Sequence, residues 1–475
     1  MAITHRYTLL IVESPTIAHI IRKFNIPYLE VIATGGFCWY PRYNWENDRL
    51  TYQADPAKRD IRKEIKTKAH YADRIIIATD TDSAGEFIAF TISRYLKRHQ
   101  LLRGHLQTLS KSSVLEILEH VQPYEEHNVI GLKNRFICNL LIQKKMQHRL
   151  GKLAWIKLLT LNLFNNGIHT RFFLENDPLN PAVIESEQTA PISIHDKLQV
   201  NDVSINKRYS IKNPWNTADI LQNLHSPDIS YRQLQDDLNH LFTLIPEDLH
   251  NGLISYPRTQ ATGYYEQTWY SHYQNWIKTH SPETFLPNSL WQRLDDYYPH
   301  ESIHPISIEI IPSEVRPLIR KKYYDIYHKI YDHHIKILQM PEQHEYYIYQ
   351  LNNNSRNYPI NVFSSSLLKI GDEIQPVIRI SDYLNYLTDY KSARPSGYGA
   401  ILDTLLEDGW ITIKSSCIFP NQDMLAKFSS QFISKPNLLS DSLTYIKNSV
   451  YTDIKWPDSK LLDVIQRITS MLRLS

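Results

Sequence analysis

A tyrosine and an arginine stand two positions apart in the segment GLISYPRTQ, Gly252 to Gln260. The phenol of Tyr256 could attack phosphorus, but it is neutral near pH 7 because its unperturbed pKa is about 10. The transition state of such an attack also gathers negative charge. Arg258 meets both needs, since a guanidinium stays charged and can bind two phosphate oxygens at once. The pair predicts covalent chemistry on a phosphodiester.

Three carboxylates follow apolar runs near the amino terminus. Glu13 comes directly after YTLLIV, and Asp80 and Asp82 follow RIIIA closely. Clustered carboxylates repel one another and usually share a cation, and oxygen ligands suit Mg²⁺. One acid at a strand end is more often a helix cap, but the three together, in the context DTD-x-x-G, predict a metal site.

The elements around these acids should bring them together. Tyr7 to Val12 and Arg74 to Ala78 are short apolar runs that predict buried strands. Ser14-Pro15 is typical of a helix start, and Ile88 and Ile92 recur at helical spacing in the segment after the second strand. Alternation of strand and helix favours a parallel sheet, whose ligands gather beyond the carboxyl ends of the strands. We therefore expect the acids at that edge.

The charge balance leaves the partner open, but its distribution is informative. The 475 residues carry 52 basic and 50 acidic side chains. Residues 127–174 nevertheless contain no Asp or Glu and eight Lys or Arg, among them Lys157. Such a stretch suits a surface that follows phosphates, or equally an ordinary solvated helix face.

Several classes of protein are not expected. Cys38, Cys138 and Cys417 form no CxxC pair, which predicts neither a disulfide framework nor a zinc ribbon and fits a reducing compartment. The start MAITHRYTLLIVESP does not read as a signal peptide, because its apolar run is short and leads into a polar motif. No run of 18 apolar residues occurs, so no membrane span is expected.

Four segments, taken in order, resemble type IA DNA topoisomerases. LLIVESP followed by IIIATDTDSAGE is similar to the Toprim domain that these enzymes share with bacterial primases. GLISYPRT resembles their active-site segment, and the preceding helices resemble their approach to the tyrosine. HESIHPIS (His300–Ser307) resembles HEAIRPT, and ARPSGYGAILDTLLEDGWI (Ala393–Ile411) resembles GRPSTYASIISTLQDRGYV. Four matches in family order identify the chain as a divergent and short member.

The resemblance implies a role for each matching residue. Tyr256 would be the nucleophile, Arg258 and His300 would neutralise charge at the scissile phosphate, and Glu13 would be the general acid. The implied magnesium ligands are Glu13, Asp80 and Asp82.

Two segments imply contacts with single-stranded DNA. LLIQKKMQHRLG (Leu140–Gly151) resembles a basic helix of the family, with lysines in place of its arginine pair. The entrance to the helix after ARPSGY carries an arginine, a hydroxyl and an aromatic ring, which suit backbone contact and base stacking. The implied DNA-binding residues are Lys144, Lys145, Arg149, Arg394, Ser396 and Tyr398.

The chain also departs from the family pattern elsewhere, with Ile17 for a lysine, Ala84 for a glutamate, His304 for an arginine and Gln260 for an aspartate. The lost lysine removes a positive charge from the scissile phosphate. Arg22 or Lys23 could supply one from the same helix.

The implied fold is multidomain, α/β and α+β, with a Rossmann-like parallel Toprim sheet in a four-part toroid. The Toprim domain is expected at residues 1–120, and a basic helical domain that binds single strands at 121–190 and 390–475. Two β arches are expected at 191–232 and 312–389, and the helical domain that carries the tyrosine at 233–311. His333 and His334 are expected on the surface.

The implied function is Mg²⁺-dependent, ATP-independent cleavage of one DNA strand through a 5′-phosphotyrosine, with strand passage and religation that relax or unlink DNA. The expected partner is DNA in single-stranded segments, and neither ATP nor a membrane is expected to take part. The protein is expected to act as a monomer in the cytoplasm, at the nucleoid. Two alternatives stay open. One is a catalytically degenerate paralogue that binds single strands, which the departures favour. The other is a Toprim nuclease or primase-like enzyme with a structural Tyr256, against which stands the lack of any other polymerase or nuclease motif.

Overall fold

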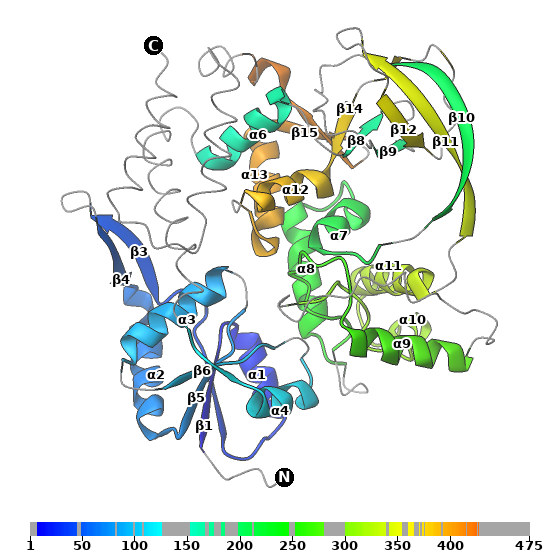
Figure 1. The fold of residues 1–475 in the computed structure, drawn as a ribbon. Helices are drawn as coiled ribbons and strands as arrows, with labels where there is room; N and C mark the ends of the chain where they lie inside the picture. The colour runs from blue at the N-terminus through cyan, green and yellow to red at the C-terminus, as the bar shows by residue number, and fades with distance from the viewer. Residues whose placement is uncertain are drawn as a thin grey trace.

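The computed structural model describes residues 7–44, 49–80, 83–97, 100–106, 109–125, 153–166, 171–174, 182–185, 198–210, 213–246, 252–279, 300–338, 342–353, 360–364, 370, 373–374, 376–390, 393–414, 416–424 and 426. Figure 1 shows a sheet flanked by helices at the lower left, a group of helices beside it, and a long curved β-ribbon at the upper right. No helix among these residues has both the length and the apolar character needed to cross a membrane.

The amino-terminal part contains a mainly parallel sheet, as predicted, and this sheet has five strands. Its strands are β1 (Thr8–Val12), β2 (Leu29–Ala33), β5 (Arg74–Ile77), β6 (Leu101–Arg103) and β7 (Gln122–Pro123), in the order β2-β1-β5-β6-β7. All neighbours pair in parallel except β7, which runs antiparallel to β6. The chain passes from one side of β1 to the other after β2. The carboxyl ends of β1 and β5 therefore flank a switch point, where such sheets bind ligands.

Helices cover both faces of this sheet because the side chains of its central strands alternate. Leu10 and Val12 pack on one face with α1 and α4, and Leu9 and Ile11 pack on the other with α2 and α3. The helices are α1 (Pro15–Lys23), α2 (Arg59–Tyr71), α3 (Ser83–Tyr95) and α4 (Lys111–Glu119). Ser14 caps α1 by accepting from the N–H of Ile17 at 3.4 Å.

A two-stranded hairpin interrupts this part between β2 and α2. It consists of β3 (Trp39–Asn44) and β4 (Arg49–Ala54), which are antiparallel, and it is followed by the short helix η1 (Pro56–Lys58). Figure 1 shows it projecting away from the sheet.

A helical region carries the tyrosine and continues into a second helical group. The helices around the tyrosine are α7 (Thr217–Leu224), α8 (Tyr231–Thr243), α9 (Glu266–Thr279), α10 (Pro312–Val315) and α11 (Lys321–Leu338). The second group contains α6 (Ala154–Asn166), α12 (Ile380–Asp389), η4 (Pro395–Gly397) and α13 (Tyr398–Glu407). Helix α13 packs on α8 and α12 packs on α7. One apolar cluster runs from the α1 and α4 face of the sheet through these helices.

Two further sheets complete the described fold. The first has the order β12-β11-β10-β13, with β10 (Leu198–Ser210), β11 (Glu342–Asn353), β12 (Ile360–Ser364) and β13 (Glu373–Ile374). The second has the order β15-β16-β14-β8-β9, with β8 (Arg171–Leu174), β9 (Ala182–Glu185), β14 (Pro376–Arg379), β15 (Ile411–Lys414) and β16 (Cys417–Pro420).

The expected domain edges differ from the elements found at three places. Residues 312–338, expected within a β arch, form α10 and α11, so the β segment begins only at Glu342. Helix α7 lies in the other expected arch but packs with α8 and α12. Residues 171–174 and 182–185, expected in a helical part, form strands β8 and β9. The charged, tyrosine-rich composition of α11 hid its buried face from sequence reasoning.

Candidate active site

The loop that carries Tyr256 is paired with residues 300–306. The N–H of Ser255 donates to the carbonyl of His304 at 2.9 Å, and the hydroxyl of Ser255 donates to the carbonyl of Ser302 at 3.1 Å. Because both chain segments are held by these bonds, the side chains that follow Ser255 and precede Ser302 lie side by side.

Tyr256 meets the amino-terminal sheet through Asp80. Its hydroxyl donates a short hydrogen bond to Oδ2 of Asp80, and Nη1 of Arg258 donates to the same oxygen at 3.1 Å. Arg258 is held in this direction because its Nε donates to Oδ1 of Asn239, on α8, at 3.0 Å. Phenol, guanidinium and carboxylate thus converge from positions 176 and 178 residues apart in the chain.

Two aromatic neighbours fix the phenol ring. His300 stacks on it with ring centroids 4.1 Å apart, and Phe242 of α8 meets it edge-on at 5.4 Å. Tyr256 is only 6% exposed. The ring therefore cannot swing freely, and its hydroxyl points at the acidic edge of the sheet.

One small pocket is lined by Glu13, Asp80, Tyr256 and His300, all predicted site residues. Glu13 directly follows β1 and Asp80 lies shortly beyond β5, so the predicted edge of the sheet brings both acids to the pocket. Their oxygen donors fit the ligand preference of Mg²⁺. Asp82, the third predicted ligand, lies outside the described residues, among which no group of three or more His, Cys, Asp and Glu is arranged to hold a metal.

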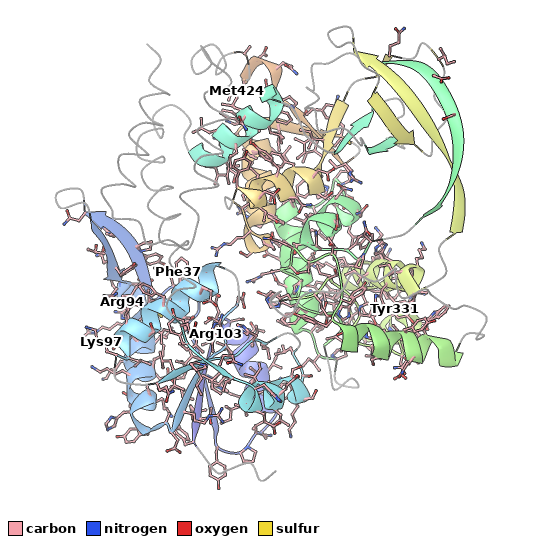
Figure 2. The ribbon with its side chains drawn as sticks, viewed as in Figure 1. Phe37, Arg94, Lys97, Arg103, Tyr331 and Met424 are labelled. Atoms are coloured by element: carbon pink, nitrogen blue, oxygen red, sulfur yellow. The ribbon has the colours of Figure 1, made fainter. Side chains whose placement is uncertain are left out.

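The backbone at Asp80 is fixed by close packing of the following helix. A Cβ on Gly85 would lie 1.7 Å from the carbonyl oxygen of Asp80, so only glycine fits. The hydroxyl of Thr79 donates to the carbonyl of Gly85 at 2.8 Å. Arg103, labelled in Figure 2 and only 5% exposed, donates to the carbonyl of Asp80 at 2.9 Å and pairs with Glu86 at 2.7 Å. Sequence reasoning missed Arg103, whose only signal is its position at the end of β6.

The departures from the family pattern have structural counterparts. Ile17 lines the pocket, so an apolar side chain occupies the place where the family pattern has a cation. Arg22 does not replace that cation, because Nη2 donates to the carbonyl of Val31 in β2 at 2.6 Å. Ala84 is buried at the start of α3.

The predicted DNA-binding residues fall into two groups. Lys144, Lys145 and Arg149 lie outside the described residues. Arg394 and Ser396 are half-buried at the entrance to η4 and α13.

Tyr398 and Lys157 are buried in this structure. Tyr398 is 1% exposed, and it shares a hydrogen bond of 2.6 Å with Thr388, so its ring does not lie open for base stacking here, and its contact with DNA stays a prediction. Burial raises the pKa of this phenol. Lys157 is also buried, where it pairs with Asp408 at 2.7 Å. Both serve the packing of α6, α12 and α13 instead.

The expectation that His334 lies on the surface is wrong, whereas His333 is partly exposed. His334 is 2% exposed and hydrogen-bonded on both ring nitrogens. His333 is half-buried and stacks on Trp215 at 3.8 Å. Helix α11 carries polar residues on most of its surface, which concealed a buried histidine.

Thr217, at the first position of α7, is a support for the tyrosine loop that sequence reasoning did not single out. It is fully buried, and its hydroxyl oxygen lies 2.7 Å from the carbonyl of Pro257 and 2.9 Å from that of Thr259, so its one proton is shared between these two acceptors. It also accepts from the N–H of Thr259 at 2.9 Å. The threonine at this helix start was visible in the sequence, but its partners were not.

Comparison with known proteins agrees with the arrangement of the amino-terminal sheet. Residues 8–111 match the Toprim domain family. DNA topoisomerase 1 of Mycoplasma pneumoniae is 25% identical over 348 residues, which cover 58% of this chain and 48% of that protein. DNA topoisomerase 1 of Campylobacter jejuni is 29% identical over 153 residues, which cover 30% of this chain and 22% of that protein. The chain thus spans about half the length of the first relative and a smaller share of the length of the second.

The whole fold also has a counterpart among solved structures. Full-length topoisomerase I from Thermotoga maritima matches with a TM-score of 0.67 over 98% of this chain and 90% of that one. Sequence identity between the two is 16%, so this likeness concerns the fold.

Proposed function

Because the chain is a member of the type IA topoisomerase family, we propose that it cuts and reseals one strand of DNA through Tyr256. The single observation that carries the proposal is the hydrogen bond from the Tyr256 hydroxyl to Asp80. It joins a nucleophile from the helical region to a carboxylate of the Toprim sheet, in a pocket that Glu13 and His300 also line.

Attack begins with loss of the phenol proton. Asp80 is the group within hydrogen-bonding reach of that proton, so it is placed to accept it. Tyr256 then bonds to the phosphorus and forms a 5′-phosphotyrosine, and the 3′-oxygen departs. Arg258, aimed by Asn239 at the same position, neutralises the charge that develops on the phosphate oxygens.

Glu13 and His300 serve the leaving group and the phosphate. Glu13 protonates the departing 3′-oxygen, and His300, stacked on the phenol, donates to a phosphate oxygen. A well-placed donor of this kind contributes about 3 kcal/mol to the transition state. The phosphodiester energy is retained in the phosphotyrosine, so resealing by the 3′-hydroxyl needs no ATP.

Glu13, Asp80 and Asp82 would hold Mg²⁺. When bound, the ion supplies positive charge that orders the broken ends for resealing. Of these, Glu13 and Asp80 bring oxygen ligands to the pocket that Tyr256 also lines.

The substrate in this proposal is single-stranded DNA within a duplex. Lys144, Lys145, Arg149, Arg394 and Ser396 contact its backbone. Movement of the tyrosine region away from the Toprim sheet lets a second strand pass, which relaxes or unlinks DNA. The enzyme acts as a monomer on DNA in the cytoplasm, at the nucleoid.

The test is a search for a covalent adduct. The protein is incubated with end-labelled single-stranded DNA and Mg²⁺, denatured, and separated by electrophoresis. A labelled protein band is expected for the native chain and none for Tyr256→Phe. The control Tyr331→Phe should give a normal band, because it loses a hydroxyl that donates to the carbonyl of Ile308. If EDTA is added to the adduct, resealing should stop.

A second candidate is a degenerate paralogue that binds single strands without cutting them. Ile17 in the pocket favours it, because the phosphate then meets an apolar side chain where the family pattern has a lysine. Binding of labelled DNA with no adduct at any Mg²⁺ concentration would support this candidate. An adduct that depends on Tyr256 would exclude it.

A further inference from the structure

A chain of buried hydrogen bonds lies behind the candidate active site. The hydroxyl of Tyr264 lies 3.0 Å from Nδ1 of His334, and Nε2 of His334 lies 2.9 Å from Nδ1 of His272. Nε2 of His272 lies 3.1 Å from the carbonyl oxygen of Ile306. Both histidines are less than 5% exposed, and they come from different helices, α9 and α11.

These three bonds admit one direction when both rings are neutral. The carbonyl of Ile306 only accepts, so His272 carries its proton on Nε2, and its Nδ1 accepts. His334 must then donate from Nε2, which leaves its Nδ1 to accept from the Tyr264 hydroxyl. Each donor has one acceptor, and an added proton on either ring would require the Tyr264 hydroxyl to turn from donor to acceptor, so the chain of bonds would have to reverse or break.

A buried pair of His304 and Glu301 lies against this chain. Nε2 of His304 lies 3.0 Å from a carboxylate oxygen of Glu301, and Nδ1 lies 2.7 Å from the carbonyl of Pro305. Both ring nitrogens of His304 therefore face oxygen atoms. Glu301 also accepts from the N–H of Tyr265 at 3.1 Å and the hydroxyl of Thr268 at 3.1 Å. The pair of His304 and Glu301 lowers the pKa of Glu301 despite its burial.

Both sets of bonds end on residues 300–306. Ile306 accepts from His272, and His304 holds Glu301, which directly follows the histidine stacked on Tyr256. The ring of His304 lies 5.2 Å from that of His272. The segment that directly follows His300 is thus held by a polar network rooted in α9 and α11.

We propose that Tyr264, His334, His272, His304 and Glu301 are positioning residues that hold His300 against Tyr256, and that a proton added to His272 or His334 releases this segment. This inference rests on the proposed strand cleavage. It predicts that cleavage activity is lost in acid because residues outside the catalytic set take up protons.

The direction of the pH effect follows from burial. Burial, aided by the charge of His304, lowers the pKa of His272 from 6.5 to about 4, and burial lowers the pKa of His334 well below 6.5. The groups facing these rings are Tyr264, His304, Glu301 and His333. Between about pH 4 and 6.5 the unfolded chain binds more protons at His272 than the folded one, so the stability contributed by the neutral ring is complete above that window and is lost as the pH falls through it. The folded network itself takes up a proton at the lower end of the window.

The first experiment compares two losses of a buried phenol hydroxyl. Tyr264→Phe removes the donor to His334, whereas Tyr327→Phe removes an equally buried hydroxyl that donates to the carbonyl of Ile310. The initial rate of adduct formation at pH 7.5 should fall about tenfold for Tyr264→Phe and less than about twofold for Tyr327→Phe. Equal rates for the two variants would overturn the positioning role.

The second experiment separates this pH effect from titration of the catalytic carboxylates. The amide of His272→Gln can donate and accept as the neutral ring does, but it takes up no proton. At pH 7.5 its rate should stay within about threefold of the native rate. The acid limb of the pH–rate profile of this variant should lie at lower pH than that of the native chain. An unchanged acid limb would contradict the release of the segment by protonation.

A third measurement works even if the native chain forms no adduct. The ¹⁵N chemical shifts of the histidine rings report which nitrogen carries the proton. The network predicts neutral rings protonated on Nε2 for His272 and His334 at pH 7.5. Absence of any adduct together with these tautomers would refute the strand cleavage and retain the network. Protonation on Nδ1, or charged rings, would refute the network itself.

Discussion

At the scale of single residues, Asp80 is the point on which the candidate site depends. Its carboxylate accepts from Tyr256 and Arg258, and its carbonyl accepts from Arg103. The sequence predicted the acid, the phenol and the guanidinium from their types and spacing. It could not predict Arg103, because a buried arginine is specified by carbonyl groups that only the folded chain brings together.

The closest contact at Asp80 gives a prediction for Gly85→Ala. The new methyl group would overlap the carbonyl oxygen of Asp80, which is backbone and cannot move aside cheaply. We expect a loss of about 3 kcal/mol in the free energy of unfolding, measured by urea denaturation, and loss of the adduct. Gly397→Ala is the control, since its Cβ would meet nothing nearer than 4.0 Å. Equal stability of the two variants would contradict the packing at Asp80.

At the scale of elements, the amino-terminal sheet was predictable and the support of the tyrosine loop was not. Apolar runs at residues 7–12 and 74–78 became β1 and β5, because strands buried on both faces are apolar throughout. Helix α11 was missed because only a narrow stripe of it is buried. His334 lies in that stripe, and a polar residue gives no sequence signal of burial.

The bond between α7 and the tyrosine loop gives the prediction for Thr217→Val. Valine keeps the shape but leaves the N–H of Thr259 and the carbonyl of Pro257 without their buried partner. We expect a loss of about 2 kcal/mol in the free energy of unfolding and a slower formation of the adduct.

Thr91→Val is the matched control for this change. The hydroxyl of Thr91 is also buried, but it donates only to Ile88 within its own helix. A loss below about 0.5 kcal/mol is expected there by urea denaturation. Similar losses in the two variants would show that Thr217 has no special role in holding the loop.

At the scale of the whole molecule, the site exists only while two distant parts of the chain are in contact. The resemblance of four segments, in order, to type IA topoisomerases predicted that these two parts come into contact. The apolar cluster shared by the sheet and the helices provides the physical basis of that contact. Sequence patterns report local periodicity, so they gave neither the width of the contact nor the stacking of His300 on Tyr256. Strand passage in the proposed cycle requires this contact to open.

Opening can be measured as a change in distance between the two parts. Fluorophores would be placed on Tyr71→Cys at the end of α2, which is 71% exposed, and on Leu318→Cys after α10, which is 36% exposed. Cys38 and Cys417 are buried, and Cys138 would be replaced by serine. Asp80→Ala removes the acceptor of both Tyr256 and Arg258, so the separated population should rise about tenfold, the equivalent of ~1.4 kcal/mol.

Asp382→Ala is the control for that measurement, because the partner of Asp382 among the described residues is Arg379, only three positions away. Its distance distribution should match that of the native chain. A native-like distribution for Asp80→Ala as well would mean that apolar packing alone holds the two parts together. In that case the bonds to Asp80 would serve only to aim Tyr256 and Arg258, and the energy needed to open the molecule would have to be sought in the shared core.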